Sequence, residues 1–308
     1  MSLARNALLW ASTNPTLSQK LPRMGFVRRA VRKFMPGERL EHALDAAEQI
    51  KSHGITAIVT RLGENLTDLS EATEARNHYL AVYGEIARRG LDCWVSIKPT
   101  QLGLDLDKSY CAECLEMLAT EAERHGNQLW VDMESSEYVD VTLELFRELR
   151  AKHDNVGLCL QSYLFRNDDD IAETIEMSSH IRLVKGAYAE PPDVAYPDKK
   201  DVDEKYFEQA SRLLEASRTG GGLPGIATHD ERMVERIAKV AADGDTPAPY
   251  EIEMLYGIAT GSQIRWAAQG RAVRVLISYG EAWYPWYMRR LAERPANVGF
   301  VIRNMFRR

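Results

Sequence analysis

The chain has 308 residues, of which 45% are hydrophobic and 27% charged, and it carries a formal net charge of -6. These values are ordinary for a soluble globular protein, and the length allows one large core or two smaller ones. A negative chain has no global basic field, so we expect no nucleic-acid partner. No apolar run approaches the ~20 residues of a membrane-spanning helix, and Ala7–Ala11 is too short for a signal peptide. We therefore expect a cytoplasmic protein.

The first predicted elements are two or three helices within residues 1–40, an N-terminal arm that caps or embraces a catalytic domain of residues 41–308. The first 33 residues contain no Asp or Glu, whereas their basic residues are Arg5, Lys20, Arg23, Arg28, Arg29, Arg32 and Lys33. This charge makes peripheral contact with the inner face of an anionic membrane one interpretation. A solvated helical face is the alternative.

Short strand-like runs then recur along the chain, each following a helical stretch. They are Ile55–Leu62, Cys93–Thr100, Leu129–Met133, Gly157–Leu164, Ile181–Ala187, Gly225–His229, Glu251–Gly257 and Val273–Ser278. Apolar residues at three- and four-residue spacing predict helices between them, such as Ser70–Arg89, Ser109–His125, Val139–His153, Asp203–Ser217 and Glu231–Asp243. Strand and helix alternating in this way predict an α/β protein with a parallel sheet.

Eight such units in about 250 residues favour a (β/α)8 barrel. A doubly wound open sheet is the alternative, but no G-x-G-x-x-G follows the first strand, which counts against a Rossmann dinucleotide site. Cys111 and Cys114 form a C-x-x-C inside a helical pattern without a second pair, so we interpret them as helix residues rather than a zinc or redox site.

Polar residues cluster where the predicted strands end, which is where the active sites of such barrels lie. They include Glu64, Lys98, Gln101, Asp132, Glu134, Gln161, Arg182, Lys185, Thr228, His229, Glu251 and Glu253. Singly, a lysine can snorkel, an aspartate can cap a helix and a histidine can be satisfied in the core. Together they predict a functional site, because buried charges cost several kcal/mol unless they are paired. His229 has no partner at metal-ligand spacing and H-E-x-x-H is absent, so we expect no metal.

The C-terminal region carries two adjacent arginines, Arg289 and Arg290, beside an aromatic run over residues 283–287, and Glu293 follows them. Each guanidinium is a fixed, charged fork that matches a carboxylate or phosphate. The alternative is a surface helix with i,i+3 and i,i+4 ion pairs to Glu293. The surplus of cations over anions among these polar residues favours an anionic ligand.

Several motifs in order resemble those of the proline dehydrogenase family, from about residue 20 to the C-terminus. They are LGE at 62–64, SIKPTQLG at 96–103, VDME at 131–134, LQSYL at 160–164, RLVKGAY at 182–188, ATHD at 227–230 and RRLAER at 289–294. The resemblance is to the small bacterial form without an aldehyde dehydrogenase domain. It implies a distorted (β/α)8 barrel with non-covalent FAD, oxidation of L-proline to Δ1-pyrroline-5-carboxylate, and membrane quinone as electron acceptor.

The resemblance also implies roles for individual residues. Lys98, Arg289 and Arg290 would hold the substrate carboxylate, with Asp132 in the adjoining polar network. Glu64 would pair with Arg289 as a gate, and Leu255, Tyr256 and Leu276 would complete the substrate pocket. Arg182 would lie near the flavin N5, and the remaining flavin-lining residues would be Gln161, Lys185, Gly186, Ala187, Tyr188, Thr228, His229 and Glu293.

The chain departs from the family pattern at three positions. Leu276 replaces a tyrosine that stacks on the proline ring, Trp286 replaces another tyrosine, and Thr60 stands where an acid is common. We therefore expect altered affinity or a wider substrate range, such as hydroxyproline or another cyclic secondary amino acid. Two further hypotheses remain: a Schiff-base aldolase or lyase with Lys98 or Lys185 as nucleophile, and a flavin- or amino-acid-binding regulator without turnover.

Overall fold

Eight parallel strands close into a barrel in which each strand pairs with its neighbours in chain order and β8 pairs with β1. The computed structural model describes Asn14 and residues 31–63 and 66–284. The strands are β1 (Thr56–Arg61), β2 (Cys93–Ile97), β3 (Leu129–Val131), β4 (Val156–Gln161), β5 (His180–Val184), β6 (Pro224–Ala227), β7 (Glu251–Leu255) and β8 (Val273–Tyr279). The predicted barrel is confirmed, and the open doubly wound sheet is wrong.

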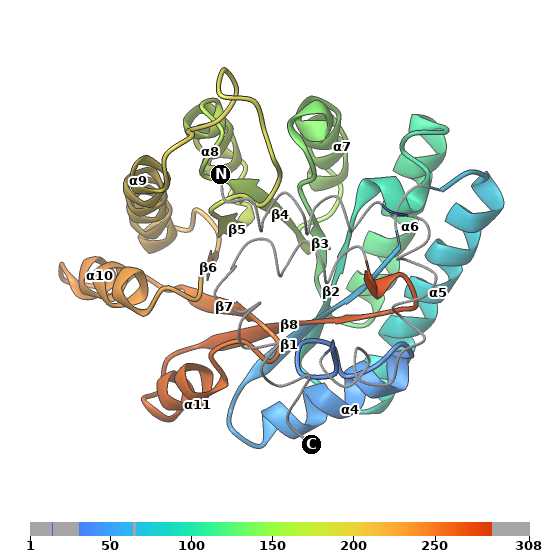
Figure 1. The fold of residues 1–308 in the computed structure, drawn as a ribbon, viewed down its shortest axis with the longest axis horizontal. Helices are drawn as coiled ribbons and strands as arrows, with labels where there is room; N and C mark the ends of the chain where they lie inside the picture. Colours follow the sequence, from blue (N-terminus) through green and yellow to red (C-terminus); the bar gives the residue numbers. More distant parts are fainter. Residues whose placement is uncertain (1–13, 15–30, 64–65, 285–308) are drawn as a thin grey trace.

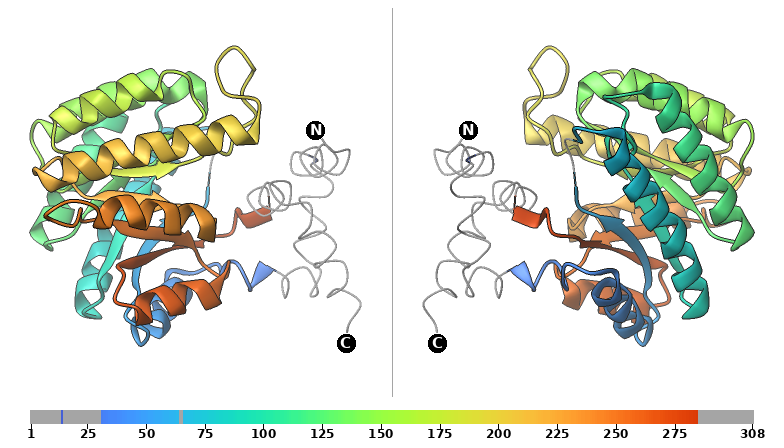
Figure 2. Two further views of the ribbon diagram at one scale, coloured as in Figure 1. Left: turned by 90° about the vertical axis from the view of Figure 1, so that its left-hand side faces the viewer. Right: turned by 90° about the vertical axis from the view of Figure 1, so that its right-hand side faces the viewer.

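Helices surround this barrel and lie along its outside (Figures 1 and 2). They are α4 (Leu40–Lys51), α5 (Leu69–Arg88), α6 (Lys108–Arg124), α7 (Val139–Arg150), α8 (Asn167–Glu176), α9 (Lys199–Arg218), α10 (Glu231–Ala242) and α11 (Thr260–Ala268). The five helices named from apolar spacing are all present. The spacing had not singled out α4, α8 and α11, of which α8 and α11 have 10 and 9 residues and offer few turns in which a period can be seen.

Several strands end earlier than predicted, because the polar residues that follow them have already left the sheet. After β2, a 3-10 helix, η2 (Pro99–Leu102), begins at Pro99, whose ring nitrogen cannot donate to a strand ladder. A second one, η3 (Ser136–Tyr138), precedes α7. Many polar motif residues therefore lie on turns at the C-terminal ends of the strands, while Gln161 and Arg182 remain within β4 and β5. The loop between β5 and α9 also extends beyond the helices (Figure 2).

The barrel interior is filled by aromatic and charged side chains as well as apolar ones. At the N-terminal end, Arg274 of β8 binds Glu251 through two contacts of 2.7 and 3.0 Å and Asp92 through one of 2.8 Å. Its guanidinium carbon lies 3.3 Å from the ring centre of Trp94, and Trp94 contacts Trp130 at 5.9 Å between centroids. These pairs satisfy charges that would otherwise be costly to bury.

Trp130 fits in the barrel because the residue beside it on β4 is a glycine. Gly157 pairs with Trp130 in register, and a Cβ added there would lie 2.8 Å from the indole ring. This distance is shorter than a van der Waals contact, so packing against Trp130 requires a glycine at position 157.

The first described residues of the N-terminal region lie at the C-terminal end of the barrel. The carbonyl oxygen of Lys33 approaches Gly257, just after β7, and the indole nitrogen of Trp283 donates to Glu38 at 3.0 Å. The division into an arm of residues 1–40 and a domain of residues 41–308 remains a prediction, because most of the arm is outside the described residues. No helix among the described residues has the length and apolar character needed to cross a membrane.

All four cysteines are buried and free. Cys111 and Cys114 lie on the buried face of α6, and burial raises the pKa of the Cys111 thiol well above its usual range. This position agrees with their interpretation as helix residues.

We predict that Gly157→Ala lowers the free energy of unfolding by ~1–3 kcal/mol, because the new methyl group overpacks Trp130. Gly84→Ala is the control, since Gly84 lies inside α5 with no atom within 4 Å of an added Cβ. It should stabilise the protein by up to ~1 kcal/mol. Urea denaturation followed by fluorescence measures both, and equal effects of the two substitutions would contradict the packing argument.

Candidate active site

The buried guanidinium of Arg182 lies at the centre of the polar residues that the barrel brings together. Its Nη1 donates to Asp132 Oδ1 at 2.8 Å and to Ser96 Oγ at 3.0 Å, and its Nε donates to Glu253 Oε2 at 2.5 Å. These four side chains come from β2, the end of β3, β5 and β7, so they meet across the barrel interior. We call them the Arg182 cluster.

Burial and charge determine the protonation of this cluster. The side chains of Arg182 and Glu253 are 4% and 3% exposed, while that of Asp132 is 17% exposed and faces the C-terminal end. Burial alone would lower the pKa of Arg182, but the carboxylates of Glu253 and Asp132 raise it, so Arg182 stays charged. Burial raises the pKa of Glu253 above its usual value, although the charge of Arg182 opposes that rise.

Several buried polar atoms of the cluster and its surroundings have no hydrogen-bond partner among the described residues. They are Arg182 Nη2, Glu253 Oε1, Gln161 Oε1 and the indole nitrogen of Trp130. The guanidinium carbon of Arg182 also lies 4.5 Å from the ring centre of Trp130. An unsatisfied buried polar group costs about 1–3 kcal/mol, so such atoms indicate a ligand or ordered water.

Gln101 connects the loops after β1 and β2. Its side-chain nitrogen donates to the carbonyl oxygens of Arg61 at 2.6 Å and Gly63 at 2.8 Å, and its oxygen accepts from the backbone of Lys98 at 3.2 Å. Lys98 is half-buried and directly follows β2. Gln101 therefore positions both Lys98 and the segment that leads to residue 64.

The loop after β5 contacts the segments that follow β3 and β4. Glu190 accepts from the backbone nitrogen of Ser136 at 2.8 Å and from its hydroxyl at 2.5 Å. Gly186 has a φ of 114°, and an added Cβ would lie 2.3 Å from the ring of Tyr163. Ala187 is exposed and Tyr188 half-buried in the same loop.

Lys185 is directed away from the Arg182 cluster. Its ammonium group binds Asp203 at 2.6 Å and Asp230 at 3.5 Å, at the N-terminal ends of α9 and α10. This ion pairing disfavours the Schiff-base hypothesis for Lys185, because two carboxylates hold its side-chain nitrogen away from the cluster.

The ends of β6 and β7 are held together by His229. Its Nε2 accepts the backbone N–H of Leu255 at 3.0 Å, which requires the imidazole to be unprotonated at that nitrogen. Thr228 is buried, and its hydroxyl accepts from the backbone of Asp230 at 3.2 Å. Leu255 and Tyr256 follow as half-buried residues on the same edge.

Leu276 lies on β8 in register with Ile58 of β1 and Leu255 of β7. Its side chain is half-buried, and its carbonyl oxygen accepts the backbone N–H of Tyr256 at 3.0 Å. Thr60, the other departure on a strand, is buried at the end of β1. Glu64, Trp286, Arg289, Arg290 and Glu293 lie outside the described residues.

Strand position in the sequence had indicated Arg182, Asp132 and Glu253 but not Ser96, and it did not show that Glu253 pairs with Arg182. The missing signal is register, because alternation shows which residues point inward without showing which of them meet. The same alternation would have placed Ser96 two residues before Lys98 on the inward face of β2.

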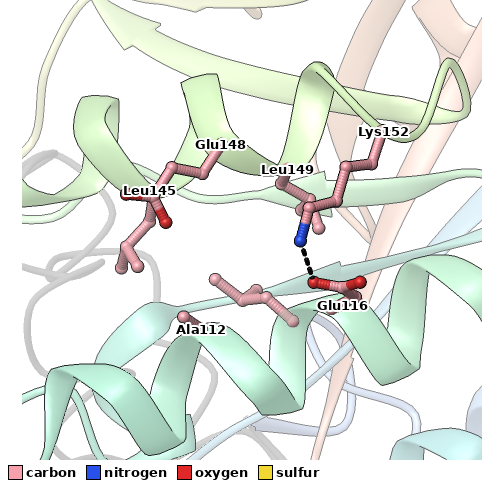
Figure 3. Close-up of a pocket in the computed structure, with 7 residues that line it drawn as sticks. Ala112, Glu116, Leu145, Glu148, Leu149 and Lys152 are labelled. Atoms are coloured by element: carbon pink, nitrogen blue, oxygen red, sulfur yellow. Dashed lines mark hydrogen bonds and ion pairs between the residues drawn. The ribbon is translucent and has the colours of Figure 1, made fainter.

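A small pocket between α6 and α7 offers no alternative site (Figure 3). It lies on the outer helices, and the ion pair of Lys152 with Glu116 at 2.5 Å closes one side. Its lining residues are Ala112, Leu115, Glu116, Leu145, Glu148, Leu149 and Lys152. Among the described residues, no group of three or more His, Cys, Asp or Glu side chains is arranged to hold a metal ion.

Comparison with known proteins places the chain in a family. The sequence profile of the proline dehydrogenase family matches residues 43–303. Proline dehydrogenase 2 of Bacillus subtilis subsp. natto is 34% identical over 306 residues, which cover 99% of this chain and 99% of that protein. Proline dehydrogenase of Deinococcus radiodurans is 36% identical over 313 residues, covering 99% of this chain and 98% of that protein.

This chain belongs to the proline dehydrogenase family. The resemblance seen in its motifs is thereby confirmed. Among solved structures, proline utilization A from Bdellovibrio bacteriovorus, inactivated by N-propargylglycine, is similar with a TM-score of 0.82 and 22% identity. The match covers 97% of this chain and 37% of that one, and it shows that the two share the barrel fold.

The site of this family member fits a flavin. An isoalloxazine ring has both donors and acceptors along its edge, and the cluster offers an unpartnered donor on Arg182 and an unpartnered acceptor on Gln161. Both residues are buried, which also suits a planar, largely apolar ring system.

We predict that Gln101→Leu destabilises the protein by about 1–3 kcal/mol, because it leaves the part-buried carbonyls of Arg61 and Gly63 without their donor. Gln49→Leu, on the exposed face of α4, is the control and should change stability by less than ~0.5 kcal/mol. Chemical denaturation measures both variants. A Gln101 variant as stable as the control would show that these hydrogen bonds do not hold the loop after β1.

Proposed function

We propose that this protein is a FAD-dependent proline dehydrogenase that oxidises L-proline to Δ1-pyrroline-5-carboxylate, the first step of proline catabolism to glutamate. Family membership supports the substrate and the reaction class. The observation that carries the proposal is the buried Arg182 guanidinium in the barrel interior, which has a donor without a partner among the described residues, as Gln161 at the end of β4 has an acceptor. A cationic donor at that place suits a flavin ring whose negative charge increases on reduction.

In this proposal, Lys98, Arg289 and Arg290 bind the substrate carboxylate, while Glu64 pairs with Arg289 as a gate. Lys98 is the member of this set within the described residues, and it follows β2 at the rim where Asp132 is partly exposed. Arginine forks suit the task because they bind a carboxylate through two parallel hydrogen bonds. Leu255, Tyr256 and Leu276, from neighbouring strands, form the apolar side of the pocket.

The flavin is held, in the same proposal, by residues from the ends of β4, β5 and β6 and from the C-terminal region. They are Gln161, Arg182, Lys185, Gly186, Ala187, Tyr188, Thr228, His229 and Glu293. The described members of this set lie on consecutive strand ends, which is consistent with one extended ligand across that side of the rim.

The chemistry requires the amine of proline to be neutral, because its lone pair assists departure of a hydride from ring carbon C5. A flavin held by Arg182 and Gln161 would supply the hydride acceptor, and loss of the remaining N–H proton from the substrate would give the cyclic imine. The cationic residues around the substrate favour amine deprotonation, since positive neighbours lower an amine pKa. The protein supplies orientation and charge rather than a nucleophile, with the arginine pair fixing the carboxylate.

The electron acceptor in this proposal is membrane quinone, reached from the cytoplasmic side. The basic residues between Arg5 and Lys33 would bring the protein to an anionic membrane surface by charge.

The first test is anaerobic mixing of the purified protein with L-proline. We expect a yellow protein that absorbs at about 450 nm, as flavins do, and that loses this absorbance on mixing. A protein without bound flavin, or a flavin that L-proline leaves oxidised, would contradict the proposed function. The second outcome would support the regulator hypothesis.

Arg289→Met and Arg290→Met should each lower kcat/KM for proline roughly 100-fold, because the proposed charge partner of the substrate carboxylate is lost. Arg236→Met is the matched control, since Arg236 lies on the outer face and binds Glu204 of α9. It removes the same charge without reaching the site and should leave kcat/KM unchanged.

A second substrate class is favoured by one feature, the half-buried leucine at position 276. An isobutyl group leaves more room beside the substrate ring than an aromatic side chain and offers no hydroxyl. We therefore propose that the enzyme also accepts hydroxyproline or another cyclic secondary amino acid.

Leu276→Tyr should raise the preference for proline over hydroxyproline by roughly 10-fold in kcat/KM, because the larger side chain excludes a ring substituent. Leu276→Met, which conserves volume, is the control and should keep the substrate range of the natural chain. Rates of flavin reduction with proline, both hydroxyprolines and pipecolate measure the effect. Identical preferences in all three proteins would contradict a role for this position in specificity.

A further inference from the structure

Two glutamates of β7, Glu251 and Glu253, point into the barrel at successive levels. Glu251 binds Arg274 at the N-terminal end, where Arg274 also binds the largely exposed Asp92. Glu253 lies one level nearer the active site and binds Arg182. The two glutamates carry the same charge and lie on the same strand, but Glu253 is closer to the active site.

Glu253 is the second carboxylate on a single guanidinium. Arg182 already binds Asp132 at 2.8 Å, and Glu253 binds its Nε at 2.5 Å from the opposite side of the barrel. Two carboxylates on one cation leave the ionised cluster with a net negative charge. Glu253 also fixes the plane of the guanidinium, because Nε and Nη1 are held in different directions and Nη2 is left without a partner among the described residues.

The two carboxylate oxygens of Glu253 have different surroundings. Its Oε1 has no hydrogen-bond partner in the described part of the chain. Gly225 of β6 makes room for this oxygen, since an added Cβ there would lie 2.2 Å from it. A buried carboxylate exerts its charge over a longer range than an exposed one, because little water screens it.

We propose that Glu253 is a positioning residue that orients Arg182 and, through its negative charge, lowers the reduction potential of the bound flavin. This inference rests on the proposed function, in which Arg182 lies against the flavin. Two-electron reduction adds negative charge to the ring, so a carboxylate behind Arg182 opposes reduction while the guanidinium favours it. Glu253 thereby limits how strongly Arg182 stabilises the reduced cofactor.

The test is the midpoint potential of the flavin-loaded protein, measured anaerobically with a reference dye and without any substrate. Glu253→Gln keeps the shape of the side chain and removes the charge. We expect the ratio of reduced to oxidised flavin at a fixed potential to increase at least tenfold, which corresponds to a rise of ~30 mV for a two-electron couple. Glu251→Gln is the matched control and should change that ratio less than threefold.

The pH dependence separates a charge effect from a change in packing. Burial raises the pKa of Glu253, so acid neutralises it and makes the natural chain resemble Glu253→Gln. The difference in potential between the two should therefore be largest at high pH and shrink as pH falls. The other titratable or charged groups that act on or near Glu253 are Asp132, Cys159, Arg182, Tyr206, Glu251 and Arg274. Both proteins contain all of them, so their titration is common to the two curves.

Two further variants complete the experiment. Glu253→Asp retains the charge and should keep the flavin ratio within threefold of the natural chain. Glu253→Met provides a second neutral side chain of similar length if the Gln variant does not retain its fold by thermal unfolding. Equal potentials in the natural chain and a folded, flavin-loaded neutral variant would overturn the inference and leave the proposed function intact. A protein that binds no flavin would overturn both.

Discussion

The contact on which the site depends is the buried ion pairing of Arg182 with Asp132 and Glu253. A guanidinium that is 4% exposed is tolerated in a barrel core because carboxylates from two other strands bind it. The pairing raises the pKa of Arg182 despite burial, and it directs one nitrogen away from any partner among the described residues. Arg182 therefore both pairs with carboxylates from other strands and keeps one nitrogen able to bind a ligand.

Small residues elsewhere in the barrel make this arrangement possible. Gly157 leaves space for Trp130, whose ring lies under the guanidinium, and Gly225 leaves space for the free oxygen of Glu253. Both glycines face the interior, where a methyl group would collide with a neighbouring strand's side chain. Large ionic and aromatic side chains on some strands thus fill the interior volume that glycines on neighbouring strands leave open.

Hydrogen bonds between neighbouring loops hold the C-terminal rim of the barrel in place. Gln101 joins the ends of β1 and β2, Glu134 accepts from Thr100 at 2.8 Å, and His229 joins β6 to β7. The bonds of Gln101 and His229 hold backbone next to residues proposed to bind a ligand, namely Lys98 and Leu255. These contacts leave the side chain at position 276 free to differ among family members, and here it is a leucine.

The sequence by itself determined the barrel and the edge on which the site lies. Alternating strand and helix patterns define eight βα units, and a parallel sheet brings their polar C-terminal ends to one edge. The partners were decided only by the tertiary structure, since Arg182 lies 50 residues from Asp132, 86 from Ser96 and 71 from Glu253. The pairing of Lys185 with Asp203 and Asp230, away from the cluster, was equally invisible in the sequence. The reason is physical: local periodicity specifies which way a side chain points, whereas closure of the barrel specifies which side chains it meets.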